Sequence, residues 1–452
     1  MKFKIEESTV FISVVKWFVL ATLVGIIVGG TVTLFLKALT FSIDLAEQYP
    51  SYFLALPIVL FLSILITQLA PDAAGHGTEK VIAAIHKNSG RIKILVVPVK
   101  LFTTIITLAA GGSVGKEGPC AQIGAGLASG FADLFRFDDY DRRKLVICGI
   151  SAGFASVFGT PIAGAIFGVE VLFIGTILYD VLLPSFIAGI TAYQISSAFG
   201  IKYFYHSIEI IPAFSEVYFL KVAIAGIFFG LCSIYMIDLL KVLEKISEKI
   251  TIWKPLKGLI GGGLLIALTF TFSTSFLGLG LDTIESCLKG HEIVWYAFLV
   301  KVLFTAVTLS FGGSGGILTP VFFVGATSGA VFAQLLGLDI ATFSSIGMVS
   351  MLAASTNTPI AASILCIELF GAKVAPFATV ACVISFMVSG HRSVYPSQVL
   401  AINKTRKAQV EIGKELETLE ENYEAGGSRN YILHTLRLIN RRMRTTITKR
   451  GK

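Results

Sequence analysis

Residues 111–119, Gly-Gly-Ser-Val-Gly-Lys-Glu-Gly-Pro, interrupt an apolar part of the chain and place one carboxylate, Glu117, at its end. Residues 101–110, directly before this stretch, carry no charge. Broken backbone at membrane depth is tolerated only where protein or a water-filled cavity surrounds it. An ionisable residue at that depth marks a functional site. The stretch therefore predicts a membrane protein in which Glu117 lies on an ion pathway.

The composition of the chain is that of an integral membrane protein. Of its 452 residues, 54% are hydrophobic and 15% are charged, against about 25% charged in a soluble protein. The apolar run at 10–36 is too long for the core of a signal peptide and predicts the first membrane helix. The net charge of +8 agrees with basic cytoplasmic loops. The six cysteines form no CxxC pair, so neither a metal site nor a disulfide framework is predicted.

Many apolar segments are shorter than the roughly 20 residues that a full crossing needs. Gly and Pro interrupt them, as in Gly159-Thr160-Pro161 and Asn357-Thr358-Pro359. Short, interrupted segments are typical of the interior of a channel or transporter. We therefore predict an all-α, multi-pass protein of the cell membrane, with a transport domain over residues 1–400.

An internal repeat relates the two halves of this domain. Residues 99–119 (VKLFTTIITLAAGGSVGKEGP) align with 300–320 (VKVLFTAVTLSFGGSGGILTP), and 160–170 (TPIAGAIFGVE) align with 358–368 (TPIAASILCIE). The shared Lys, Pro and Glu residues are rare at membrane depth and argue against chance similarity. We place the repeats at about 10–200 and 215–400, with the site at their interface. Lys100 and Lys301, which the repeat aligns, are expected to pair with a charge or to snorkel.

Each glycine turn is predicted to start a helix, near Lys116 in the first repeat and near Ile317 in the second. Pro119 and Pro320 fit the first turn, where backbone amides have no partner inside the helix. Free amides and the positive end of the helix dipole make a helix N-terminus an anion site. Two such ends, brought together by the repeat, would bind a small anion moderately, as conduction requires.

A third candidate helix start is Gly75-His76-Gly77-Thr78. Its amides would also be open to an anion, but a GxG pattern is equally compatible with an ordinary loop. A phosphate site is poorly supported, because no GK[ST] follows a strand and no dinucleotide motif opens a βαβ unit.

These motifs resemble those of the chloride channel (CLC) family of anion channels and proton-coupled anion exchangers. The resemblance rests on GKEGP at 115–119, GILTP at 316–320, the loop around His76, and Tyr395 in GHRSVY at 390–395; it spans about residues 10–405. It implies an inverted-repeat bundle of short, broken helices that forms a homodimer with one anion pathway per subunit. Two motifs depart from the family pattern, since Leu318-Thr319 replaces the usual Phe-Ala and His76 replaces the usual Ser.

The resemblance also implies roles for the site residues. Glu117 is expected to be the gate, with its carboxylate in an anion site when the pathway is closed. Anion-binding groups are expected at His76, Gly77, Glu117, Gly118, Ile317, Leu318 and Tyr395, the last through its hydroxyl. His76 would either donate to the anion and add pH sensitivity, or turn its ring away. No metal is expected, and no cofactor besides chloride as a ligand.

Two functions within the family remain open. Val171 stands where proton-coupled members often carry a second glutamate, directly after Glu170, and valine carries no proton. This favours a voltage-gated-type chloride channel over the alternative, a chloride/proton antiporter. Glu170 and Glu368, which the repeat aligns, are expected to cap broken helices. An unrelated ion-coupled transporter, or an intramembrane enzyme using Glu117 and His76, are remote alternatives, so we expect no enzyme.

Positive charge predicts the orientation of the chain. The lysines between residues 241 and 257, and the basic residues after 401, place these regions and both termini in the cytoplasm. Residues 401–452 are predicted to form a basic tail, whose part at 433–444 fits either an amphipathic membrane-surface segment or a solvated helix. The expected partners are chloride or a similar anion, membrane lipid and a second copy of the chain, but not nucleic acid.

Overall fold

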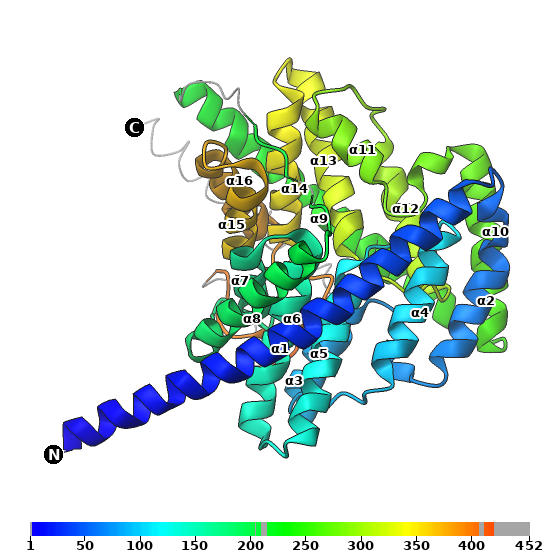
Figure 1. The fold of residues 1–452 in the computed structure, drawn as a ribbon. Coiled ribbons are helices and arrows are strands. Elements are labelled where there is room, and N and C mark those ends of the chain that lie inside the picture. Colours follow the sequence, from blue (N-terminus) through cyan, green and yellow to red (C-terminus); the bar gives the residue numbers. More distant parts are fainter. Residues whose placement is uncertain (1, 204, 209–214, 406–410, 420–452) are drawn as a thin grey trace.

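The computed structural model describes residues 2–203, 205–208, 215–405 and 411–419, and most of these residues are helical (Figure 1). The predicted basic segment at 433–444 lies outside the described residues. The α-helices are α1 (Lys2–Glu47), α2 (Leu56–Thr67), α3 (Gly77–Asn88), α4 (Val96–Ala109), α5 (Glu117–Leu134), α6 (Asp139–Phe158), α7 (Pro161–Glu170), α8 (Tyr179–Ala198), α9 (Glu216–Lys249), α10 (Lys254–Thr271), α11 (Leu281–Leu288), α12 (Ala297–Ser310), α13 (Leu318–Leu336), α14 (Ile340–Thr356), α15 (Pro359–Phe370) and α16 (Ala375–Val388). Two short parallel strands, β1 (Phe173–Ile174) and β2 (Val399–Leu400), pair with each other.

Helix lengths confirm the predicted mixture of full and broken membrane segments. Among the described residues, α1, α8, α9 and α13 are long and apolar enough to cross a membrane, whereas α4, α7, α12, α14, α15 and α16 are shorter. The 10 residues of α7 rise by about 15 Å, half of a hydrocarbon core of about 30 Å. Helix ends therefore fall inside the thickness of the domain.

Small residues let the central helices cross closely, and they do so in the same way in both repeats. A Cβ atom added to Gly124 of α5 would lie 2.1 Å from the carbonyl oxygen of Gly149 in α6. The aligned pair in the second repeat is Gly325 of α13 and Gly347 of α14, where the corresponding distance is 2.5 Å. Backbone therefore packs on backbone at both crossings, which glycine alone permits.

The aligned turns of the two repeats are joined by a reciprocal pair of hydrogen bonds. The Ser113 N–H donates to the Thr308 hydroxyl at 3.1 Å, and the Ser314 N–H donates to the Thr107 hydroxyl at 3.2 Å. Exchanging the repeats turns one contact into the other, as an internal two-fold relation requires. The predicted duplication is therefore present in the three-dimensional structure.

The aligned lysines neither pair with a charge nor snorkel, so that expectation is wrong. Both side chains are fully buried. The Lys100 ammonium donates to the carbonyls of Ala73 and Gly75, and the Lys301 ammonium donates to those of Phe276 and Gly278. A cluster of carbonyl dipoles satisfies each buried ammonium. Each lysine therefore fixes the loop that precedes α3 or α11.

Part of the predicted tail packs against the transport domain. Leu416 and Leu419 bury their side chains with Ile174 and Leu400 of the two strands. Nearby, Lys87 of α3 forms an ion pair with Glu415 at 2.9 Å. Residues 411–419 consequently lie beside α3.

We expect Gly149→Ala to lower thermal stability, because its Cβ would lie 2.4 Å from the carbonyl oxygen of Gly124. Overpacking of this kind costs about 1–3 kcal/mol. The matched control is Gly263→Ala in α10, where nothing lies within 4 Å of the added Cβ and alanine favours the helix. Thermal unfolding in detergent should show a lower midpoint for Gly149→Ala only; equal midpoints would contradict the close crossing.

Candidate functional site

Three glycine-containing loops touch one another at the centre of the domain. The Gly115 N–H donates to the Gly316 carbonyl and the Gly316 N–H donates to the Gly115 carbonyl, both at 2.6 Å. His76 forms a bridge with Gly315. A Cβ added to Gly77 would lie 2.6 Å from the carbonyl oxygen of Gly118. The N-terminal ends of α3, α5 and α13 thus converge, and the predicted anion-binding loops lie together.

The Glu117 carboxylate occupies the N-terminal end of the helix from the other repeat. Its Oε1 accepts from the Thr319 hydroxyl at 2.6 Å, and its Oε2 accepts from the Thr319 N–H at 3.1 Å. The side chain is 2% exposed. A carboxylate at this place is stabilised by charge-assisted hydrogen bonds and by the positive end of the α13 dipole. It therefore fills a position that suits an anion.

The sequence interpretation missed Thr319, although the signal was present. This residue follows Leu318, which the repeat aligns with Glu117, and both positions depart from the usual Phe-Ala of the family. A hydroxyl at the second residue of a predicted helix, beside free amides, adds a donor where alanine offers none. Leu318 itself is 1% exposed and starts α13.

His76 turns its ring inward rather than away. The ring centroids of His76 and Tyr395 are 6.0 Å apart. The His76 Nδ1 and the Tyr395 hydroxyl are both buried, and neither has a hydrogen-bond partner in the described part of the chain. Buried polar atoms without a protein partner are normally satisfied by water or by a ligand. The side chains of His76 and Tyr395, both predicted to bind the anion, therefore each carry a polar atom that is able to bind water or a ligand.

Two pockets approach this centre from opposite ends of α2. The first, which we call the α1 pocket, has a volume of about 390 Å³ and is lined by Tyr52, before α2, and by Lys116. The second, the α3 pocket, has a volume of about 450 Å³ and is lined by Ala74 and His76, after α2, and by Ile317. Both pockets include residues next to the glycine turns.

The C-terminal ends of the aligned helices α4 and α12 line different pockets. Leu108 and Ala109, at the C-terminal end of α4, line the α1 pocket. Leu309 and Ser310, at the C-terminal end of the aligned helix α12, line the α3 pocket. The C-terminal ends of these aligned helices therefore face different pockets, as expected for the predicted inverted repeat.

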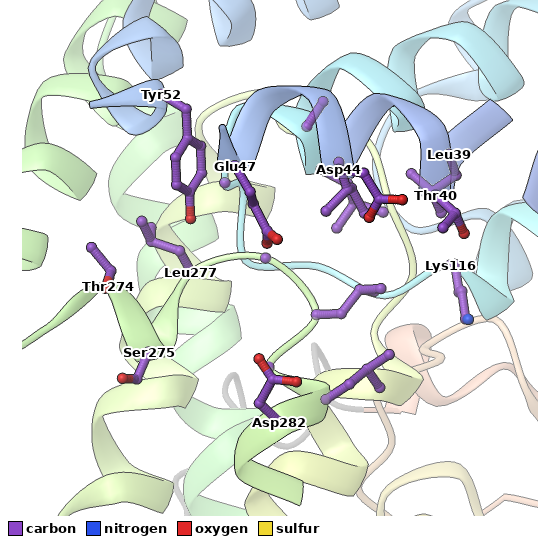
Figure 2. A pocket seen from close by; sticks show the side chains of 18 of the residues that line it. Leu39, Thr40, Asp44, Glu47, Tyr52, Lys116, Thr274, Ser275, Leu277 and Asp282 are labelled. Carbon is purple, nitrogen blue, oxygen red and sulfur yellow. The ribbon is translucent and has the colours of Figure 1, made fainter. Parts of the chain in front are cut away.

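Acidic groups dominate the charge of the α1 pocket. Its charged lining residues are Asp44 and Glu47 at the end of α1, Asp282 of α11, and Lys116. Figure 2 shows the carboxylates of Glu47 and Asp282 on facing walls, with Lys116 at one side. The α3 pocket contains both signs, with Glu79, Lys80, Lys87, Lys241, Glu244 and Glu417 in its lining.

Glu170 and Glu368 cap each other's helices, as predicted. Glu170, at the end of α7, accepts from the N–H groups of Ile360 and Ala361 at 3.1 and 2.8 Å. Glu368 of α15 accepts from the N–H groups of Ile162 and Ala163 at 3.0 and 2.7 Å. Each carboxylate satisfies two amides that have no partner inside their own helix. These carboxylates have a structural role in joining α7 to α15.

A buried network of side chains fixes the loop that carries Tyr395. The Ser393 hydroxyl donates to Gln398 Oε1 at 2.6 Å and accepts from the Tyr395 N–H at 3.0 Å. Gln398 Nε2 donates to the carbonyls of Val171 and Thr356 at 2.7 and 2.8 Å. The loop that carries Tyr395 is consequently tied to the ends of α7 and α14.

The apolar helices are those of a multi-pass membrane protein, and a buried carboxylate lies between helix ends from the two repeats. Residues 58–390 match the model of the voltage gated chloride channel family, and the chain belongs to this anion-transporting family. It is 35% identical over 408 residues to the chloride/fluoride channel protein of Pseudomonas syringae pv. tomato, covering 88% of this chain and 90% of that protein. It is 28% identical over 304 residues to the voltage-gated ClC-type chloride channel ClcB of Escherichia coli, covering 64% and 72%.

Two solved structures have the same fold. The crystal structure of a CLC-type fluoride/proton antiporter superposes with a TM-score of 0.81 at 29% identity, covering 85% of this chain and 98% of that one. A slow cyanobacterial Cl⁻/H⁺ antiporter gives a TM-score of 0.73 at 20% identity, covering 82% and 94%.

We expect Glu170→Ala to destabilise the protein, because it leaves two helix-end amides of α15 without an acceptor. Each unsatisfied amide costs about 1–3 kcal/mol, so the midpoint of thermal unfolding in detergent should fall. The control is Glu170→Gln, whose amide oxygen still accepts from one N–H. That variant should unfold closer to the wild type and retain anion transport; loss of transport in a stable Glu170→Gln protein would assign Glu170 a role beyond capping.

Proposed function

We propose that the chain exchanges a small anion, fluoride or chloride, for protons across the membrane, with Glu117 as gate and proton carrier. The contact between the Glu117 carboxylate and Thr319 carries the proposal. The Glu117 carboxylate accepts a hydrogen bond from the Thr319 N–H at the N-terminal end of α13. An anion can therefore bind this N–H only after the carboxylate has left. Anion binding and the position of Glu117 are then mutually exclusive.

Protonation supplies the means of release. A neutral carboxyl group accepts weaker hydrogen bonds than a carboxylate, so protonated Glu117 holds the N–H and hydroxyl of Thr319 less strongly. An anion that takes its place meets the N-terminal ends of α5 and α13, with the His76 and Tyr395 polar atoms on the side of the α3 pocket. The carboxylate, which can carry a proton, and the anion occupy the same position in turn. This alternation links proton transport to anion transport.

The range of anions in the proposal draws on similar proteins and on donor chemistry. Two of these similar proteins are a chloride/fluoride channel protein and a fluoride/proton antiporter. Fluoride, as a small anion, gives up water only in exchange for strong donors. The Thr319 hydroxyl, at a position where the family usually has alanine, adds one such donor to the backbone amides.

A passive anion channel is the second candidate function. It is favoured by Val171, which is fully buried and apolar at the position where exchangers often have a second glutamate. Both candidates include the homodimer implied by the family resemblance, with one pathway in each subunit. Both also place the α3 pocket on the cytoplasmic side, because Lys80, Lys87 and Lys241 line it.

Proton movement in liposomes tests the proposed exchange. With purified protein in sealed vesicles, an outward fluoride or chloride gradient should drive protons inward against their own gradient. Glu117→Gln cannot release a proton, so anion flux should continue while proton flux is lost and pH dependence disappears. Anion flux without proton movement in the wild type would favour the channel candidate. Unchanged pH dependence in Glu117→Gln would remove the proposed role of Glu117.

Thr319→Val tests the contact that holds the gate closed. It keeps the shape of the side chain but removes a hydrogen bond to a charged group, worth about 1.5–3 kcal/mol. The closed position should lose at least about tenfold in relative population, and chloride flux at neutral pH should rise, whereas fluoride also loses a donor and should gain less. Thr319→Ser retains the hydroxyl and should behave like the wild type. Equal flux from Thr319→Val and Thr319→Ser would contradict the role of the hydroxyl.

A further inference from the structure

Glu79 lines the α3 pocket, and its carboxylate has no role in the exchange proposed above. It lies at the third position of α3, and its Oε1 accepts from both the N–H and the hydroxyl of Ser397, the N–H at 3.0 Å. Its Oε2 is buried and has no hydrogen-bond partner among the described residues. The Oε1 atom of Glu79 is therefore held in place by Ser397, while the Oε2 atom remains able to form a hydrogen bond.

Helix capping does not account for this arrangement. A glutamate at the third position of a helix usually reaches back to the backbone N–H of the N-cap residue, here His76. Glu79 instead reaches Ser397, which follows Tyr395 by two residues. Its carboxylate therefore joins the start of α3 to the loop that carries Tyr395, on the wall of a pocket of about 450 Å³.

The same carboxylate lies within reach of the anion-binding centre. His76 and Glu79 both line the α3 pocket, and a separation of three residues places them on one side of α3. The ring of His76 lies beside that of Tyr395, and the charges of Glu79 and Glu117 both act on Tyr395. The two carboxylates thus lie near the same tyrosine.

The surroundings of Glu79 favour the protonated form at neutral pH more than water does. Burial raises the pKa of Glu79 to about 7, while the Ser397 hydrogen bonds and Lys80 act in the opposite direction and Glu417 acts in the same direction. The pocket wall adds Lys87 of α3 and Lys241 and Glu244 of α9. A carboxyl group of this kind can bind and release a proton near neutrality.

We propose that Glu79 is the proton-relaying group on the α3-pocket side of the pathway, in place of the carboxylate that Val171 does not provide. The proposal rests on the proton exchange proposed above. A hydronium ion in the pocket transfers its proton to Oε2, where an O–H bond forms and water is left. That O–H bond then breaks as the proton passes through water beside His76 and Tyr395 to the Glu117 carboxylate. No group is oxidised or reduced, and the reverse sequence moves a proton out.

Glu79→Gln separates a relay from a structural role. Its amide oxygen can still accept a hydrogen bond from Ser397, but the amide neither binds nor releases a proton at neutral pH. In liposomes with a fluoride or chloride gradient, we expect the ratio of protons to anions moved to fall at least about tenfold, with anion flux within about twofold of the wild type. The matched control is Glu244→Gln, a carboxylate of the same pocket wall, which should keep the wild-type ratio.

The possible outcomes are distinct. An unchanged ratio in Glu79→Gln overturns the relay alone, and parallel loss of proton and anion flux shows that Glu79 only positions the Tyr395 loop. An equal effect of Glu244→Gln overturns the assignment to Glu79. A wild-type protein that moves no protons overturns the exchange and the relay together.

Ser397→Ala gives a second measurement if Glu79→Gln does not fold. Loss of the Ser397 hydroxyl removes a hydrogen bond that favours the ionised form of Glu79, so its pKa rises further. The pH midpoint of proton coupling should therefore shift upward, measured with the pH on the α3-pocket side varied alone. A coupling midpoint that stays where the wild type has it would overturn the relay.

Discussion

The reciprocal hydrogen bonds between Gly115 and Gly316 constrain everything else in the centre of this protein. Two backbone segments lie against each other without side chains between them, and a Cβ added to Gly316 would lie 2.7 Å from the Gly118 nitrogen. This contact sets the ends of α5 and α13 face to face. Glu117 can therefore reach Thr319 in the other repeat. Without the glycine contact, a carboxylate at the start of α5 would not lie within hydrogen-bonding distance of the start of α13.

The overall fold and much of the candidate site could be predicted, because they depend on patterns that the backbone dictates. Gly-rich turns followed by proline predict helix starts, and α5 and α13 begin at Glu117 and Leu318. The aligned repeats predict that these starts meet. The capping roles of Glu170 and Glu368 follow from the same alignment, since each carboxylate faces a helix that starts with proline.

Features set by side-chain packing could not be predicted in this way. The direction of the His76 ring depends on its contact with Tyr395, which lies more than 300 residues away along the chain. Lys100 and Lys301 find carbonyl clusters that exist only once the loops before α3 and α11 have folded. The contact of Thr319 with Glu117 joins two repeats, and the position of Glu79 beside Ser397 joins α3 to a distant loop. Each of these depends on a partner that sequence spacing does not identify.

The α1 pocket and the α3 pocket differ in the charges that line them, so they are different environments for ions. Asp44, Glu47 and Asp282 outnumber Lys116 in its lining, so the local potential there is negative. Such a potential raises the local concentration of hydronium above that of the bulk solution and lowers that of anions. Dissolved salt weakens this effect over a Debye length of about 10 Å at 0.1 M. In the proposed exchange, the ionic strength on that side of the membrane therefore influences which ion reaches Glu117 first.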